Sequence, residues 1–320
     1  MRVTSEEFVA ATDSYRRELL AHCYRMVGSA QDAEDLVQEV YLRAWRGWDA
    51  FEGRASVRTW LYRIATNVCL TALQHRDRRY VPSGLGAPSN DPFEAVELAS
   101  EVQWVQPLPS SAVDPAEIVA ERNHLRLALI VSLQHLPPQQ RAVLVLREVL
   151  AFPAAAVAEM LEISVAAVKS SLQRARATLA ELAADREEIA EPSDARAKAL
   201  LDQYIAAFEN SDAAALEKLL RKDTVLEFTP SRTWFSGLAT CMPYFANFAL
   251  GEAGEWRMIP TSANGQPAAA AYRRTGEGVY EPLGIAVLTV AEDGLARITV
   301  FGDPSLIPLF GMPTEYPVRS

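Results

Sequence analysis

The chain has 320 residues, of which 49% are hydrophobic and 22% charged, and its formal net charge is -10. It is long enough for two or more domains, each with its own core. It has no long apolar run, no basic-then-apolar leader at its start and no C-x-x-C spacing among its three cysteines. We therefore expect a cytoplasmic protein without a membrane span, a disulfide framework or a metal site.

Charge is segregated along the sequence. Residues 54–79 hold six arginines against one acid, and residues 164–178 hold three basic residues and no acid. Residues 80–126 hold seven acids against two arginines, and from residue 187 onward 18 acids face 11 basic residues. Two basic islands separated by acidic segments predict a polyanion contacted at two places, although charge clusters can also be plain solvated surfaces.

Residues 5–79 show the helical period throughout. In DAEDLVQEVYLRAW the apolar residues recur at intervals of three and four, with Asp32 as the expected N-cap. A second long helix is expected from Val57 to about His75, capped by Ser56, with Trp60 on its inner face. The FEGRA segment between the two helices is expected to be a loop. Arginines and aromatic rings interleave across this loop and helix, which suits single-stranded nucleic acid.

Residues 81–115 differ in kind. They carry six prolines and no sustained periodicity, which predicts a linker of extended and turn conformations. Phe93, Trp104 and Val105 are too apolar for a mere spacer, so part of the linker is expected to dock on another surface.

A helical pattern resumes at Pro115 and is interrupted at Pro137-Pro138 and near Pro153. The segment PAAAVAEMLEISVAAVKSSLQRARATL predicts a helix-turn-helix, with helices from Ala154 and from a Ser164 cap. Its second helix would present an acid-free outer face that suits the major groove of DNA. That face consists of Ala166, Lys169, Ser170, Gln173 and Arg174.

From about Ser193 the pattern changes to two helices, a strand, another helix and several further strands. Asn264-Gly265 and Asp293-Gly294 each stand between extended runs and predict β-hairpins. Helices followed by a curled antiparallel sheet make an α+β domain. The expected fold is thus multidomain, with two all-α domains followed by one α+β domain.

The first 190 residues carry a family resemblance. DAEDLVQEVYLRAWRGWDAFEGRASVRTWLYRIATN resembles the second conserved region of bacterial sigma factors of the extracytoplasmic-function group. LPPQQRAVLVLREVLAFPAAAVAEMLEISVAAVKSSLQRARATL resembles their fourth region, and the order and spacing also match. The resemblance implies a region 2 domain at 1–80, a linker at 81–114 and a region 4 domain at 115–188.

The resemblance also implies three surfaces and two partners, core RNA polymerase and promoter DNA. A polymerase-binding face for the β′ clamp helices corresponds to Asp35, Gln38 and Glu39, and region 4 is expected to meet the β flap. The segment that reads the melted −10 element corresponds to Phe51, Arg54, Ser56, Arg58, Thr59, Arg63 and Asn67. The −35-reading face corresponds to Ala166, Lys169, Ser170, Gln173 and Arg174. Glu162 is a departure, because this family often has glycine in that turn. No catalytic residue, metal or cofactor is expected.

Residues 194–318 resemble the SnoaL-like fold, a cone of curved sheet packed by helices. Some relatives of that fold are cyclases or isomerases, and Asp223, Glu227, Tyr244 and Tyr272 are the acid/base candidates here. The aromatic residues expected to wall a pocket, or simply to form the core, are Trp234, Phe235, Phe245, Phe248 and Trp256.

The main hypothesis is a sigma factor whose C-terminal domain controls it in cis, through intramolecular contact with the sigma regions. Two alternatives are a promoter-binding regulator that never engages polymerase, and a C-terminal domain that acts as a small-molecule sensor or an enzyme. For the acidic linker, two hypotheses are a path through the polymerase's positively charged channels and a transient cover for the basic surfaces.

Overall fold

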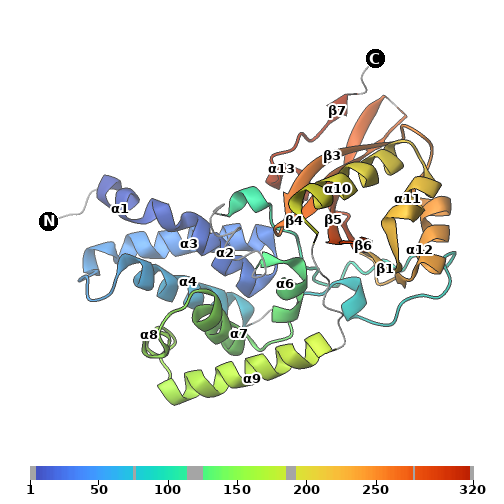
Figure 1. The fold of residues 1–320 in the computed structure, drawn as a ribbon. Helices are drawn as coiled ribbons and strands as arrows, with labels where there is room; N and C mark the ends of the chain where they lie inside the picture. The colour runs from blue at the N-terminus through green and yellow to red at the C-terminus, as the bar shows by residue number, and fades with distance from the viewer. Residues whose placement is uncertain (1–4, 75–76, 114–124, 185–191, 277, 318–320) are drawn as a thin grey trace. The chain divides into compact units, whose positions relative to one another are not determined.

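The computed structural model describes residues 5–74, 77–113, 125–184, 192–276 and 278–317. The chain divides into two compact units (Figure 1). Unit 1 comprises 1–79 and 111–187, and unit 2 comprises 80–110 and 188–320. Within the described ranges, no helix is long and apolar enough to cross a bilayer.

The first part of unit 1 is helical, as the periodicity predicts. Its helices are α1 (Ser5–Thr12), α2 (Arg16–Val27), α3 (Ala30–Gly47) and α4 (Val57–Leu73). The predicted cap of α4 is confirmed, because Ser56 Oγ accepts a hydrogen bond from the Thr59 backbone N–H at 3.1 Å. The predicted cap of α3 is wrong: Ser29 caps this helix and accepts from the backbone N–H of Asp32 at 3.1 Å. Asp32 thus lies inside the first turn, where a carboxylate also favours the helix dipole.

The second part of unit 1 contains α6 (Leu127–Leu133), α7 (Pro138–Leu144), α8 (Ala154–Met160) and α9 (Val165–Ala184). A π-helical turn, Val145–Val149, extends α7. Helices α8 and α9 form the predicted helix-turn-helix, and Ser164 Oγ accepts from the Ala167 N–H at 3.1 Å as the cap of α9. The expected helix start at Pro115, and the domain limits expected at 114, 115 and 188, lie outside the described residues.

A buried cation joins the two parts of unit 1. Arg141 of α7, 3% exposed, donates to the carbonyl of Met26 at the end of α2 and to Gln134 Oε1 at 2.8 Å. Burial lowers the pKa of Arg141 to about 10. Gly28 ends α2 in a left-handed conformation, and a Cβ there would lie 3.0 Å from the Gln134 side chain. The two helical sequence segments therefore share one compact body.

Unit 2 contains one sheet, which has seven strands within the described residues. Its order is β2 (Trp234–Ser236), β1 (Leu220–Thr229), β6 (Gly294–Phe301), β5 (Val279–Ala291), β4 (Gln266–Arg274) and β3 (Trp256–Ala263), and β7 (Tyr316–Pro317) pairs with β5. The pairing of β1 with β6 is parallel, and the other pairings are antiparallel. Both predicted hairpins are confirmed, because Ala263 pairs with Gln266 and Ala291 with Gly294.

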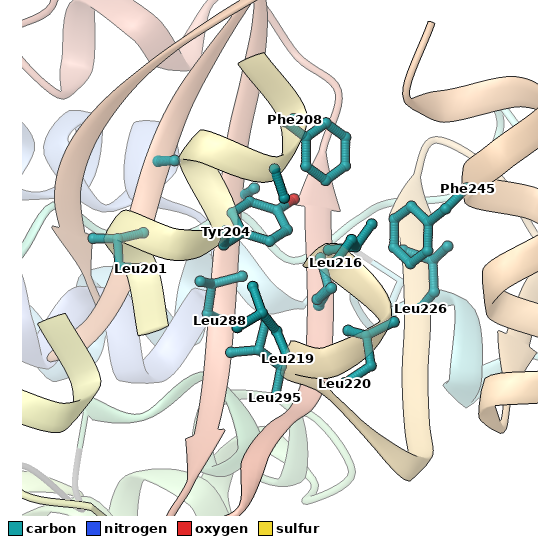
Figure 2. Close-up of a cluster of buried hydrophobic side chains, with 14 of the residues drawn as sticks. Leu201, Tyr204, Phe208, Leu216, Leu219, Leu220, Leu226, Phe245, Leu288 and Leu295 are labelled. Carbon is teal, nitrogen blue, oxygen red and sulfur yellow. The ribbon is translucent and has the colours of Figure 1, made fainter. Parts of the chain in front are cut away.

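Helices cover one face of this sheet and bury its core. Helix α10 (Asp194–Glu209) packs on β3, β4 and β5, and α11 (Ala213–Leu219) and α12 (Leu238–Tyr244) adjoin β1 (Figure 1). A short helix, α13 (Leu306–Leu309), contacts β5. Figure 2 shows Tyr204 and Phe208 of α10 lying among leucines of α11 and of the sheet. The predicted fold class, helical regions followed by an α+β domain with a curved sheet packed by helices, is confirmed.

Residues 80–110 belong to unit 2 rather than lying apart from it. Ser89 N–H donates to the Trp234 carbonyl at 2.8 Å, and Ala99 N–H donates to the Pro230 carbonyl at 2.8 Å. Near its end the segment is held by Leu108, whose N–H donates to Asn264 Oδ1 at 3.0 Å. The apolar character that predicted docking is explained in part by Val105 and Leu108, which are 0% and 2% exposed.

Candidate nucleic-acid and polymerase interfaces

An aromatic cluster holds the loop that precedes α4. Trp48 and Phe51 stack with ring centroids 5.5 Å apart, and Phe51 lies 4.9 Å from Trp60 of α4. Phe8 of α1 meets Trp48 edge-on, with ring centroids 5.3 Å apart. Because Phe51 is half-buried in this cluster, its main local contribution is to fix where the loop leaves the fold.

The loop itself, residues 52–56, is exposed. The Arg54 side chain is 84% exposed and forms an ion pair with its neighbour Glu52. The Ser56 and Thr59 hydroxyls lie 2.9 Å apart at the N-terminus of α4, so both belong to the helix cap. An arginine on a loop beside a helix N-terminus presents positive potential to an anion.

Three predicted residues line one stripe of α4. Thr59, Arg63 and Asn67 follow each other at intervals of four, which places them on one side of a helix. Arg63 and Asn67 are exposed, whereas Leu61, Tyr62 and Ala65 of the same helix are 0% exposed. Tyr62 is therefore core, and Trp60 is half-buried in the aromatic cluster. The stripe offers a cation, a hydroxyl and an amide to a bound strand.

Arg58 occupies a different position from the stripe. Its Nε donates to Glu18 Oε2 at 2.9 Å, and its guanidinium carbon lies 4.9 Å from the centre of the Tyr62 ring. Burial alone would lower the pKa of Arg58, but the hydrogen bond and charge of Glu18 outweigh it and raise this pKa. Arg58 is thus held in place by Glu18 and Tyr62, and 35% of its side chain is exposed.

The outer face of α9 brings all five predicted −35 residues together. Val168 and Leu172 point inward and are 0% and 9% exposed, packed with Val157 of α8. The residues on the opposite side of α9 are all exposed, namely Ala166, Lys169, Ser170, Gln173 and Arg174. Val165, which the sequence analysis did not include, is 40% exposed at the start of the same helix.

The predicted polymerase face lies on α3. Asp35 and Gln38 are exposed, and Glu39 is half-buried and pairs with Arg43 at 2.6 Å. Leu42, which the sequence analysis missed, is 51% exposed one turn beyond Gln38. Leu42 follows Gln38 by four residues and so lies on the same side of the helix. Apolar residues are numerous in this helix, so the sequence does not distinguish Leu42 from the core residues, and only its exposure does. An exposed apolar side chain with a polar rim is compatible with a protein interface.

The acid/base candidates of unit 2 are each engaged by different partners. Asp223 is exposed and bound to Arg221, which lowers the pKa of its carboxyl. Glu227 is bonded to Arg297 at 2.8 Å and to Thr299 at 3.1 Å. Tyr244 stacks on Phe228, and Tyr272 donates to the Pro313 carbonyl at 2.9 Å. Each candidate thus has a structural partner of its own.

The rings expected around a pocket divide between core and surface. Phe235, Phe245 and Trp256 are 0%, 2% and 8% exposed and belong to the core of unit 2. Phe248 is 54% exposed and meets Phe93 of the linker at 6.2 Å between ring centroids. Phe235, Phe245 and Trp256 are therefore residues of the hydrophobic core.

Comparison with known proteins matches both helical parts of unit 1. The Sigma-70 region 2 model matches residues 12–79, and the Sigma-70 region 4 model matches residues 126–179. We call these segments region 2 and region 4 from here on.

Whole-chain relatives agree. The ECF RNA polymerase sigma factor SigG of Mycobacterium tuberculosis is 47% identical over 96% of this chain and 84% of its own length. SigW of Bacillus subtilis is 29% identical over 54% of this chain and 87% of its own. The crystal structure of Mycobacterium tuberculosis SigJ superposes with a TM-score of 0.61 at 22% identity, over 96% of this chain and 99% of that one, which shows a shared fold. The chain therefore belongs to the extracytoplasmic-function RNA polymerase sigma factors.

Proposed function

We propose that this sigma factor works in the cytoplasm with three separate surfaces: α3 for core polymerase, α9 for the duplex −35 element, and α4 with its preceding loop for the unpaired −10 strand. The observation that carries the proposal is the outer face of α9, where all five predicted residues are exposed together on a helix whose inner side is buried. A helix of this kind inserts into the major groove with its early residues at base edges and its basic residues at phosphates.

Promoter opening needs no catalysis by this chain, and its family is not one of enzymes. Base edges and the phosphates of one strand can reach the stripe on α4 only after the duplex has parted, so each captured base favours the open state. Arg54 and Arg63 supply the phosphate contacts, and Thr59 and Asn67 supply polar groups that can hydrogen-bond to the edges of the bases. The net charge of -10 disfavours free binding to duplex DNA until polymerase holds the chain.

Polymerase docking is assigned to Asp35, Gln38 and Glu39, with Leu42 added. The carboxylates give electrostatic complementarity to a basic partner, and the exposed leucine gives buried apolar area in the complex. Region 4 is assigned to the β flap, as the resemblance implies.

The C-terminal domain is proposed to regulate the chain in cis rather than to catalyse a reaction. The linker that joins regions 2 and 4 is bonded along the described part of its length to this domain, from Ser83 to Ser110. A conformational change in this domain therefore acts on the linker between regions 2 and 4. The acid/base candidates support the same reading, since each is engaged in the fold.

Run-off transcription with bacterial core polymerase on fragmented genomic DNA tests the proposal. The full chain is compared with a chain ending at Glu191 and with core enzyme alone. Defined transcripts that require the full or shortened chain support the sigma assignment, and a changed yield on shortening supports regulation in cis. Promoter binding without any core binding would instead show a regulator that does not engage polymerase.

A further inference from the structure

Region 4 lies against the helix of region 2 that is assigned to the promoter strand. Arg63 of α4 donates from Nη2 to Glu162 Oε1 at 3.0 Å, across 99 positions of sequence. Phe152, in the loop before α8, meets the Tyr62 ring edge-on at 5.3 Å between centroids. Two elements of region 4 thus meet the same helix in the same compact unit.

Phe152 completes the enclosure of Arg58. The guanidinium carbon of Arg58 lies 5.0 Å from the Phe152 ring centre and 4.9 Å from that of Tyr62. Phe152 is only 6% exposed, so its ring is covered although it stands in a loop. A cation between two rings, with Glu18 as its ion-pair partner, is held more firmly than an exposed arginine.

Glu162 stands where a side chain is disfavoured. Its φ is 56°, in the left-handed region that glycine occupies most readily. Its side chain is 75% exposed and its carboxylate accepts from Arg63, whose side chain is 45% exposed. An ion pair this exposed is weak and opens easily, which suits a contact that must be released.

We propose that Glu162 and Phe152 form a latch that closes region 4 over the promoter-strand surface, and that the Glu162 carboxylate and a DNA strand compete for Arg63. The proposal rests on the proposed function, which assigns Arg63 to the strand. A phosphate and the Glu162 carboxylate are both anions for the same guanidinium, so bound DNA and the closed latch exclude each other. The Arg141 and Gly28 contacts involve neither Glu162 nor Phe152, so they can keep the two regions close while the latch opens.

Pulsed EPR on the full chain tests the latch without DNA. Spin labels are placed at Asp49→Cys and Ala177→Cys, both exposed, while the three native cysteines are buried. We expect Glu162→Gln and Phe152→Leu to raise the population of open distances about two- to five-fold. Glu159→Gln, which removes the same charge from exposed α8 surface, serves as the control. Identical distance distributions in all four chains overturn the latch. Glu162 is exposed, so its replacement does not endanger folding.

Anisotropy with a fluorescein-labelled, mixed-sequence single strand tests the competition. We expect Glu162→Gln to tighten binding about two- to five-fold more than Glu159→Gln does. Equal effects of the two variants overturn the competition, and the proposed function stands if Arg63→Ala still abolishes binding. If Arg63→Ala binds the single strand like the parent, Arg63 does not contact the strand, and the proposed competition fails with that assignment. The EPR distances decide separately whether Glu162 and Phe152 hold region 4 against α4.

Discussion

Glu227 and Arg297 face each other across the parallel strands β1 and β6, with Arg297 Nη1 donating to Glu227 Oε1 at 2.8 Å. The Glu227 side chain is 2% exposed, and its second oxygen accepts from the Ser83 backbone N–H at 3.1 Å. One buried carboxylate therefore joins two strands of the C-terminal domain to the first turn of the linker, the 3-10 helix Pro82–Gly84.

The first prediction concerns this carboxylate. Glu227→Ala leaves a buried N–H and a hydroxyl without their acceptor, so we expect a loss of about 2–4 kcal/mol in the free energy of unfolding. Glu227→Gln keeps an acceptor and is expected to lose about 1 kcal/mol. Urea unfolding of the full chain measures both. Equal losses for the two variants would show that only the charge matters.

The second prediction concerns the −35 face. Arg174→Ala is expected to weaken promoter binding by about 1–3 kcal/mol, because one base or phosphate contact is lost. Arg176→Ala is the matched control, since Arg176 follows two residues later and pairs with Glu148 at 2.7 Å. Footprinting with holoenzyme, repeated over a range of salt concentrations, separates the two. An unaltered footprint for Arg174→Ala refutes its role.

The third prediction concerns polymerase docking. Reversing both Asp35 and Glu39 to lysine is expected to abolish core binding, because like charges then meet across the interface. Leu42→Ser is expected to weaken it by about 1–2 kcal/mol through lost apolar burial. Asp49→Lys, a single reversal at an exposed site outside α3, controls for net charge. Co-purification with core enzyme is the measurement, and survival of binding after the double reversal removes α3 from the interface.

The fourth prediction concerns the linker. Arg232 pairs with Glu101 at 2.5 Å, and its backbone N–H donates to the Glu97 carbonyl at 2.8 Å. Arg232→Glu brings a third carboxylate to this place, so amide hydrogen exchange over 96–102 is expected to speed up several-fold. Arg274→Glu, another exposed arginine of the same domain, provides the comparison. Equal exchange in both variants would mean that backbone bonds alone hold the linker.

The fifth prediction concerns pH. His22 is buried beside Thr66, and burial together with the Arg25 charge lowers the pKa of His22 to about 3, from an ordinary value of 6.5. The unfolded chain therefore binds a proton that the folded chain excludes, so stability is full above pH 6.5. It falls by up to about 1.4 kcal/mol per unit as the pH drops from 6.5 towards 3. Urea unfolding at pH 7 and 5.5 should show this loss in the parent and a smaller one in His22→Gln.

The local elements of this chain were predictable because short-range chemistry decides them. Ser56 and Ser164 cap their helices, and Asn264-Gly265 and Asp293-Gly294 form the turns of their hairpins. The helical period of α9 places Val168 on the buried side and Lys169 on the exposed side. The exposed positions of the three surfaces follow from the same helical period. The cap of α3 was missed because Ser29 and Asp32 are both good capping residues three positions apart, and only the backbone conformation distinguishes them.

Long-range pairing was not predictable, because nothing local marks a partner many residues away. Glu162 reads as a solvated acid in a turn until Arg63 is found 3.0 Å from it, and Glu227 reads as a catalytic candidate until Arg297, Thr299 and Ser83 enclose it. The apolar residues of the linker predicted docking on some surface, but only the structure identifies that surface as the C-terminal domain. Sequence alone thus determined the helices, the caps of α4 and α9 and the hairpins, and it predicted three surfaces with a partner for each. Only the tertiary structure decided which charges are already engaged, because burial and ion pairing depend on segments that meet in space.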